Sequence, residues 1–377
     1  MKIFRLFGID IFIHYSWVFI FGLILWSFAW GFFPLLYPGL ERSVYLAAGL
    51  IGTLLFFVSV LLHELSHSLV ATRHGIEVHG ITLFIFGGVS HLADESPSPG
   101  TEFKIAVAGP LTSLLLGGLL LVVAGFSASP WEDLWAGLAA HLGFINLALG
   151  IFNLLPAFPL DGGRVLRAIL WRRSGDRLKA TSIAAAWGRG LGWVLIGSGV
   201  VIAFAGSLLQ GLWMTFIGLF LSEAAEQQRR RAVVGNLLTG LHVENLMTSH
   251  PVTIASHLSV EAAVQDYFLR HGFGGFPVVR QGDVVGVVSL AHLSRCPLPE
   301  RPRTTVETIM TPLRPDQMAL PDEDLAAAVG KMTGSGLSRL PVLARANGAK
   351  LIGLLTQHSV MRYLQIRELV SRESRAA

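Results

Sequence analysis

The decisive stretch of this sequence is LLFFVSVLLHELSHSLVA, residues 54–71, which places two histidines and a glutamate inside an apolar run. Residues four apart share one face of an α-helix, so His63 and His67 can offer two imidazole nitrogens to one metal ion. Glu64 follows the first histidine directly and can serve as general base at the same metal. An ionisable side chain within a membrane helix costs about 2.5–3.5 kcal/mol. Three together predict metal-dependent hydrolysis inside a membrane, with a pair of structural core histidines as the alternative.

The composition predicts a membrane protein with an appended domain. Of its 377 residues, 52% are hydrophobic and only 14% are charged, whereas ordinary globular chains carry about 25% charged residues. The Lys and Arg residues lie beside apolar segments instead of forming a long basic stripe, so we expect no nucleic-acid partner. Cys296 is the only cysteine in the sequence, which excludes a disulfide framework within the chain and a cysteine-based metal site.

Six segments are apolar and long enough to cross a bilayer core of about 30 Å. They lie near residues 9–33, 44–72, 104–126, 135–156, 181–206 and 208–225. We interpret the first as a retained anchor because no small-residue cleavage site follows it. Only Gly206 and Ser207 separate the last two, so five spans are the alternative. Lys and Arg gather in alternate loops, which predicts a plasma-membrane protein with both termini in the cytoplasm and the histidine motif towards that side.

Residues 76–92 predict a β-hairpin at the membrane surface. Residues 76–86 alternate loosely and are rich in β-branched and aromatic types, Gly87-Gly88 provide a turn, and 89–92 follow as a second strand. A hairpin there would have a spare edge that can bind an extended peptide by strand addition. The alternative is a structural hairpin that only covers the helix ends.

The sequence NLLPAFPLDGGR, residues 153–164, contains the candidate for a third metal ligand. Pro156 and Pro159 break the helix, and Gly162-Gly163 permit unusual backbone angles, so Asp161 can point inward from irregular backbone. Two histidines and one carboxylate leave a tetrahedral zinc ion one open position for water. The alternative is that Asp161 only caps the next helix.

These motifs, with Ala108-Gly109-Pro110 between them, resemble the site-2 protease family of intramembrane zinc metalloproteases over residues 1–225. The resemblance implies one zinc ion per chain, and the ligands it implies are His63, His67 and Asp161. It also implies Glu64 as general base and Asn153 as a residue that holds the substrate backbone or the developing oxyanion.

The implied reaction is hydrolysis of a peptide bond in or near the transmembrane segment of a single-span membrane-protein substrate. Phe158 stands where relatives often have another proline, which leaves the shape of this loop open.

After Arg231 the sequence becomes soluble α/β in character and repeats itself at a spacing of about 64 residues. Residues 245–248 return as 308–311, and residues 286–289 return as 353–356. The repeat resembles a tandem pair of cystathionine-β-synthase (CBS) domains, which implies a regulatory module that often binds adenine nucleotides between its copies. The acidic residue that usually contacts ribose is replaced here by His292 and Ser359, so a dimerisation or scaffold module is the alternative.

The expected fold is a six-helix membrane domain with a surface hairpin, followed by a soluble α/β pair of CBS domains. The expected boundaries are 1–225 for the protease domain, 226–239 for a linker, 240–300 and 301–366 for the CBS domains, and 367–377 for a tail. A CBS-regulated channel or transporter and a non-catalytic membrane scaffold are the competing functions. A channel would need polar residues along several spans, and a scaffold would not need Glu64. A homodimer formed through the CBS domains is also expected.

Overall fold

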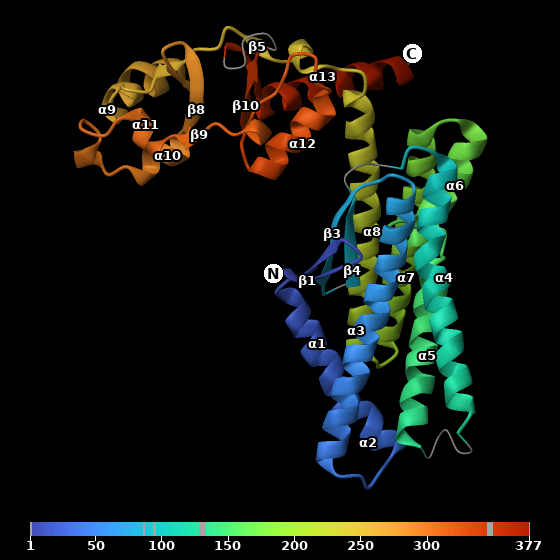
Figure 1. The fold of residues 1–377 in the computed structure, drawn as a ribbon. Helices are drawn as coiled ribbons and strands as arrows, with labels where there is room; N and C mark the ends of the chain where they lie inside the picture. The colour runs from blue at the N-terminus through green and yellow to red at the C-terminus, as the bar shows by residue number, and fades with distance from the viewer. Residues whose placement is uncertain (1, 86, 93–95, 128–132, 345–349, 377) are drawn as a thin grey trace. The chain divides into compact units, whose positions relative to one another are not determined.

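The computed structural model describes residues 2–85, 87–92, 96–127, 133–344 and 350–376 (Figure 1). The chain divides into two units, Met1–Ala232 and Val233–Ala377. The division falls inside the predicted linker, which is largely helical because α8 (Leu208–Leu238) continues through it.

Within the described ranges, six helices are long and apolar enough to cross a membrane, so the prediction of six spans is confirmed. The first comprises α1 (Ser16–Trp26), the π-helical η1 (Ser27–Phe32) and α2 (Phe33–Leu36). The others are α3 (Arg42–Arg73), α4 (Pro99–Gly125), α5 (Leu134–Asn153), α7 (Arg177–Phe204) and α8. A shorter helix, α6 (Asp161–Ser174), lies between α5 and α7 in the sequence.

The N-terminal segment does not belong to the first span, which starts at Ser16 and not at Ile9. Here β1 (Lys2–Leu6) and β2 (Ile9–Ile13) pair in antiparallel fashion. Alternation explains the difference, because Ile9 and Ile11 are buried while Asp10 between them binds Lys2 Nζ at 2.7 Å. The predicted start of this span was therefore wrong, because residues 9–13 have the alternation of a β-strand and not the continuous apolar character of a span.

The predicted hairpin is present as β3 (Val78–Phe84) and β4 (Gly87–Leu92). It forms part of a four-stranded sheet of order β1-β2-β3-β4, in which β2 runs parallel to β3. Gly87 and Gly88 belong to β4 and not to the turn, and Phe86 lies outside the described residues. Because β2 pairs with one side of β3, β4 is an edge strand of this sheet among the residues that the structure describes. Its place at the membrane surface stays a prediction.

A small apolar core joins the sheet to α3, and glycines let neighbouring helices approach each other closely. Ile9, Ile11 and Ile81 of the sheet pack with Leu65, which lies inside the histidine motif of α3. Helices α4 and α5 approach closely, since a Cβ atom at Gly117 would lie 2.8 Å from the carbonyl oxygen of Gly143. Small residues at such crossings let helix backbones pack tightly in a membrane.

The segment between α5 and α6 is irregular and well packed. Phe158 is 2% exposed and packs with Ala184, Ala185 and Ala225 of α7 and α8. Its backbone N–H donates to the Ala184 carbonyl at 3.3 Å, and the Phe158–Pro159 peptide bond is cis. The residue that replaces an expected proline is thus a core residue that anchors this loop to α7.

The second unit contains two small sheets that exchange strands between the two sequence copies. One has the order β6-β7-β8-β9 (Ile254–Ala255, Gly275–Arg280, Asp283–Ser289, Thr311–Pro312) and the other β10-β11-β5 (Arg339–Leu343, Leu351–Thr356, Thr248–Ser249). Thus β5 from the first copy completes the sheet of the second, and β9 does the reverse. The helices are η2 (Val243–Asn245), α9 (Val260–Ala263), η3 (Val264–Leu269), α10 (Leu290–Arg295), η4 (Leu298–Glu300), α11 (Val306–Ile309), η5 (Pro315–Gln317), α12 (Leu325–Ser335) and α13 (Gln357–Ala376). The predicted α/β repeat is confirmed.

Candidate metal centre

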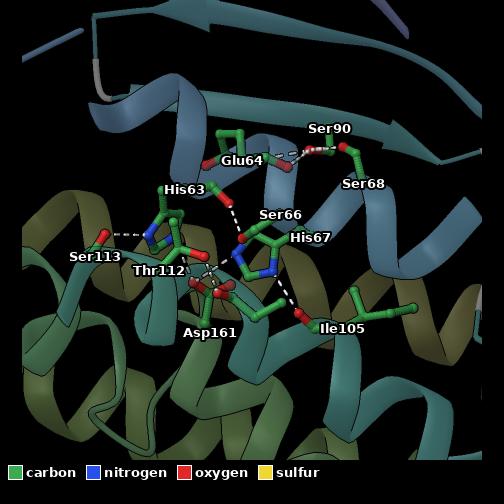
Figure 2. Close-up of polar contacts among 11 residues, drawn as sticks. His63, Glu64, Ser66, His67, Ser68, Ser90, Ile105, Thr112, Ser113 and Asp161 are labelled. Carbon is green, nitrogen blue, oxygen red and sulfur yellow. Dashed lines mark hydrogen bonds and ion pairs between the residues drawn. The ribbon is translucent and has the colours of Figure 1, made fainter. Parts of the chain in front are cut away.

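Three predicted ligands converge from two helices of the first unit (Figure 2). His63 and His67 lie on one face of α3, and Asp161 is the first residue of α6. The Nε2 atoms of both histidines lie 3.1 Å from Asp161 Oδ2. Across the described ranges, this is the one group of three or more such side chains whose ligand atoms lie close enough together, within 4.8 Å, to hold a metal ion.

Hydrogen bonds on the far side of each ring direct the Nε2 atoms to the centre. His67 Nδ1 lies 2.6 Å from the Ile105 carbonyl oxygen, which can only accept, so Nδ1 carries a hydrogen. His63 Nδ1 lies 2.9 Å from Ser113 Oγ, so the His63 ring is also held through its Nδ1 atom. Such contacts fix the orientation of metal-binding histidines.

The short contacts at the centre need a metal ion or a proton between the histidine nitrogens and the Asp161 carboxylate. A neutral His67 protonated on Nδ1 presents a lone pair on Nε2 to the lone pairs of Asp161 at 3.1 Å. Two acceptors at that distance repel each other unless a proton or a metal ion lies between them. Ligand atoms of a tetrahedral zinc site lie about 3.3 Å apart, close to the separation found here.

A glycine on α4 leaves the space that an ion needs. A Cβ atom built at Gly109 would overlap His67 Nε2 and lie 2.6 Å from His63 Nε2. The helix therefore approaches the ligand atoms with backbone alone. Both histidines are 4% exposed and the Asp161 side chain is 14% exposed, so the centre is nearly closed. Donor types, spacing and space all fit one zinc ion.

The side chain of Glu64, a residue of α3, contacts strand β4. Its Oε2 accepts a hydrogen bond from Ser90 Oγ at 3.2 Å, and Ser68 Oγ donates to Ser90 at 3.1 Å (Figure 2). The strand passes this carboxyl through Gly88, where a Cβ atom would lie 3.0 Å from Glu64 Cδ. The predicted general base is thus attached to the free edge of the sheet.

Asn153 is the last residue of α5 and is half-buried. Among the residues that the structure describes, its side chain has no hydrogen-bond partner, so no hydrogen bond links it to the three ligands. Its role at the substrate backbone or the oxyanion stays a prediction.

Sequence reasoning missed the residues that support the centre. Ser90 and Ser113 are single serines on otherwise apolar elements, and Ile105 acts through its carbonyl group. No local pattern marks any of them, because the partners of the serines lie 26 and 50 residues away.

Comparison with known proteins identifies the class of this enzyme. The sequence model of Peptidase family M50 matches residues 51–132 and 127–197, and that of the CBS domain matches 243–298 and 306–366. The chain belongs to peptidase family M50: it is a site-2 protease-like zinc metalloendopeptidase with a tandem pair of CBS domains. The predicted family, enzyme class and fold class are confirmed.

The relatives match the chain over most of its length. Rip3 of Mycobacterium tuberculosis is 36% identical over 377 residues, which cover 98% of this chain and 94% of Rip3. Zinc metalloprotease MJ0392 of Methanocaldococcus jannaschii is 33% identical over 319 residues, 84% of this chain and 85% of that protein. The solved structure of a site-2 protease from Methanocaldococcus jannaschii matches with 34% identity and a TM-score of 0.42, covering 61% of this chain and 94% of that one.

Proposed function

We propose that this metalloendopeptidase hydrolyses a peptide bond in or near the transmembrane segment of a single-span membrane protein, at a centre formed by His63, His67 and Asp161. The observation that carries the proposal is the convergence of these ligand atoms, with both Nε2 atoms 3.1 Å from Asp161 Oδ2, among helices long and apolar enough to span a membrane. A channel, transporter or scaffold has no need for this arrangement beside a carboxylate.

The side chains around the centre have separate tasks. A bound zinc ion would supply Lewis-acid activation of water and of the scissile carbonyl. Glu64 would take a proton from the attacking water and transfer it to the leaving nitrogen. The hydrogen bond from Ser90 to Oε2 orients this carboxyl group. Asn153 would donate to the oxyanion, an effect worth about 3 kcal/mol in other hydrolases.

Strand β4 is the candidate docking edge for the substrate. A peptide bond within a helix is shielded, so the substrate must unwind before it is cut. An extended segment can then add to β4, which is an edge of the sheet and bonds to Glu64 through Ser90. Strand addition uses main-chain hydrogen bonds and so suits substrates of varied sequence.

For the CBS pair we propose a regulatory or dimerisation role, with an adenine nucleotide as candidate ligand. His292, at the usual ribose-binding position, already bonds to Ser289 Oγ at 3.0 Å and to Thr311 Oγ1 at 2.9 Å. Ser359 likewise bonds to Thr356. Burial, with Arg295 nearby, lowers the pKa of His292. A ribose contact would therefore need other residues. Titration of the full-length protein with AMP and ATP tests this role.

A cleavage assay with a single-span model substrate in liposomes tests the proteolytic proposal. We expect cleavage by the parent protein and a rate at least about 100-fold lower for Glu64→Gln, although both hold zinc. Cleavage by the Glu64→Gln variant at the parental rate would exclude the proposed base. We also propose plasma-membrane location with cytoplasmic termini, from the distribution of Lys and Arg.

A further inference from the structure

A buried ion pair joins α4 to α6 close to the metal centre. Glu102, in the first turn of α4, is 0% exposed, and the Arg167 side chain on α6 is 13% exposed. Arg167 Nε donates to Glu102 Oε1 at 2.6 Å, and its Nη2 contacts the same oxygen. The guanidinium also lies over the ring of Phe158, with Cζ 5.2 Å from the ring centroid. Arg167 is thus fixed from two sides.

Stability alone does not account for this pair. Glu102 Oε2 is buried and has no hydrogen-bond partner in the part of the chain that the structure describes. Removing two charges from water costs several kcal/mol per ion, and apolar residues of similar size often replace a buried pair without loss of stability. A pair with one oxygen left unsatisfied is therefore a poor means of stabilising the fold, and its geometry needs another explanation.

The ion pair closes a loop of contacts that passes through two of the proposed zinc ligands, Asp161 and His67. Ile105 lies one turn after Glu102 on α4, and its carbonyl accepts from His67 Nδ1 at 2.6 Å. Arg167 lies on the helix that Asp161 begins, so the same turn of α4 contacts both α3 and α6. Asp161 follows an irregular segment, and helix continuity from α5 cannot set its position. The contact between Glu102 and Arg167 can.

We propose that Glu102 and Arg167 are a positioning pair, which places the Asp161 carboxylate opposite the two histidines and thereby sets zinc affinity. The inference rests on the proposed metal centre. Arg167 fixes the rotation of α6 and its position along the helix axis. Its guanidinium group donates to Glu102 at the edge and stacks on Phe158 with its face. Neither residue contacts a reacting atom.

The test measures zinc affinity and folding together on the full-length protein in detergent. The double variant Glu102→Met/Arg167→Met removes both charges at similar length. We expect the unfolding midpoint of the zinc-free protein to stay within about 3 °C of the zinc-free parent, while zinc affinity by chelator competition falls about 10–100-fold. The absorption spectrum of the cobalt-substituted protein should also change. Arg167→Lys keeps the charge but loses the fork, and we expect zinc affinity about tenfold weaker.

Arg189 provides the matched control. It joins α7 to α8 through Glu226, with Nη1 2.7 Å from Oε2, and Glu226 keeps Arg229 and Arg230 as partners when Arg189 is changed. Arg189→Met should leave zinc affinity and the cobalt spectrum unchanged.

Parental zinc affinity in a folded double variant would overturn the positioning role. If the double variant does not fold, the same measurement on Arg167→Lys decides: weaker binding supports the role, and equal binding overturns it. Failure of the metal centre itself has a different signature, because His67→Ala would then bind zinc as the parent does.

Discussion

Replacement of Gly109 by alanine tests the metal centre without altering any proposed ligand. The added methyl carbon would overlap His67 Nε2 and lie 2.6 Å from His63 Nε2. Neither ring can swing away freely, because Ser113 and the Ile105 carbonyl hold the opposite nitrogens at 2.9 and 2.6 Å. The methyl group would therefore occupy the space where the ligand atoms meet.

The size of the effect follows from the geometry. Because contacts of a Cβ atom below 3.0 Å essentially never occur, the His63 ring must withdraw by at least about 0.4 Å. Zinc sites hold ligand distances to within about 0.2 Å. We expect zinc affinity to fall at least about 100-fold, equivalent to about 2.7 kcal/mol. The fold should survive, since alanine in a helix is about 0.5–1 kcal/mol more favourable than glycine.

Bound zinc per chain, chelator competition and cleavage of a single-span substrate measure the outcome. Gly118→Ala is the control, because it lies on the same helix and a Cβ atom there meets nothing within 4 Å. It should keep parental zinc and activity. A Gly109→Ala protein that binds zinc at parental affinity and cleaves at the parental rate would refute the proposed arrangement of α4 at the centre.

Three further substitutions separate the roles of neighbouring side chains. Glu64→Gln should keep one zinc per chain while initial cleavage rates fall about 10²–10⁴-fold, the usual contribution of a general base; equal rates would contradict its role. Ser90→Ala removes a hydrogen bond to a carboxylate, worth about 1.5–3 kcal/mol, so kcat should fall about tenfold or more with KM little changed. Ser90→Thr should restore the rate, and a change confined to KM would argue against positioning of Glu64. Ser113→Ala leaves His63 Nδ1 unpaired and should weaken zinc binding about tenfold, measured by chelator competition against Thr112→Ala.

Features that depend on local periodicity could be predicted from the sequence. The spacing of His63 and His67 places them on one helical face, and the apolar flanks identify the helix as a span. The helix break at Pro156 and Pro159 predicted that Asp161 can point inward, and the structure places its carboxylate beside both histidine rings. The metal role of the three side chains stays a prediction, although the enzyme class is confirmed.

Features that depend on distant partners could not be predicted. The parallel pairing of β2 with β3 joins Ile11 to Ile81 and has no local signature. Asp10 and His14 argue against a span beginning at Ile9, since ionisable side chains are costly in a membrane anchor. The exchange of β5 and β9 between the CBS copies is equally non-local. In each case the decisive contact lies far along the chain.

Helix α4 supplies no zinc ligand and yet contacts both histidines and the helix that carries Asp161. Glu102, Ile105, Gly109 and Ser113 are spaced by three, four and four residues, so they form one stripe along a single face. They act by different means: an ion pair to α6, a carbonyl to His67, an absent side chain, and a hydroxyl to His63. The opposite face carries exposed apolar side chains such as Leu111, Leu115 and Leu119. Changes among apolar residues there should leave zinc affinity intact, because the centre depends on the position of the helix and not on its total burial.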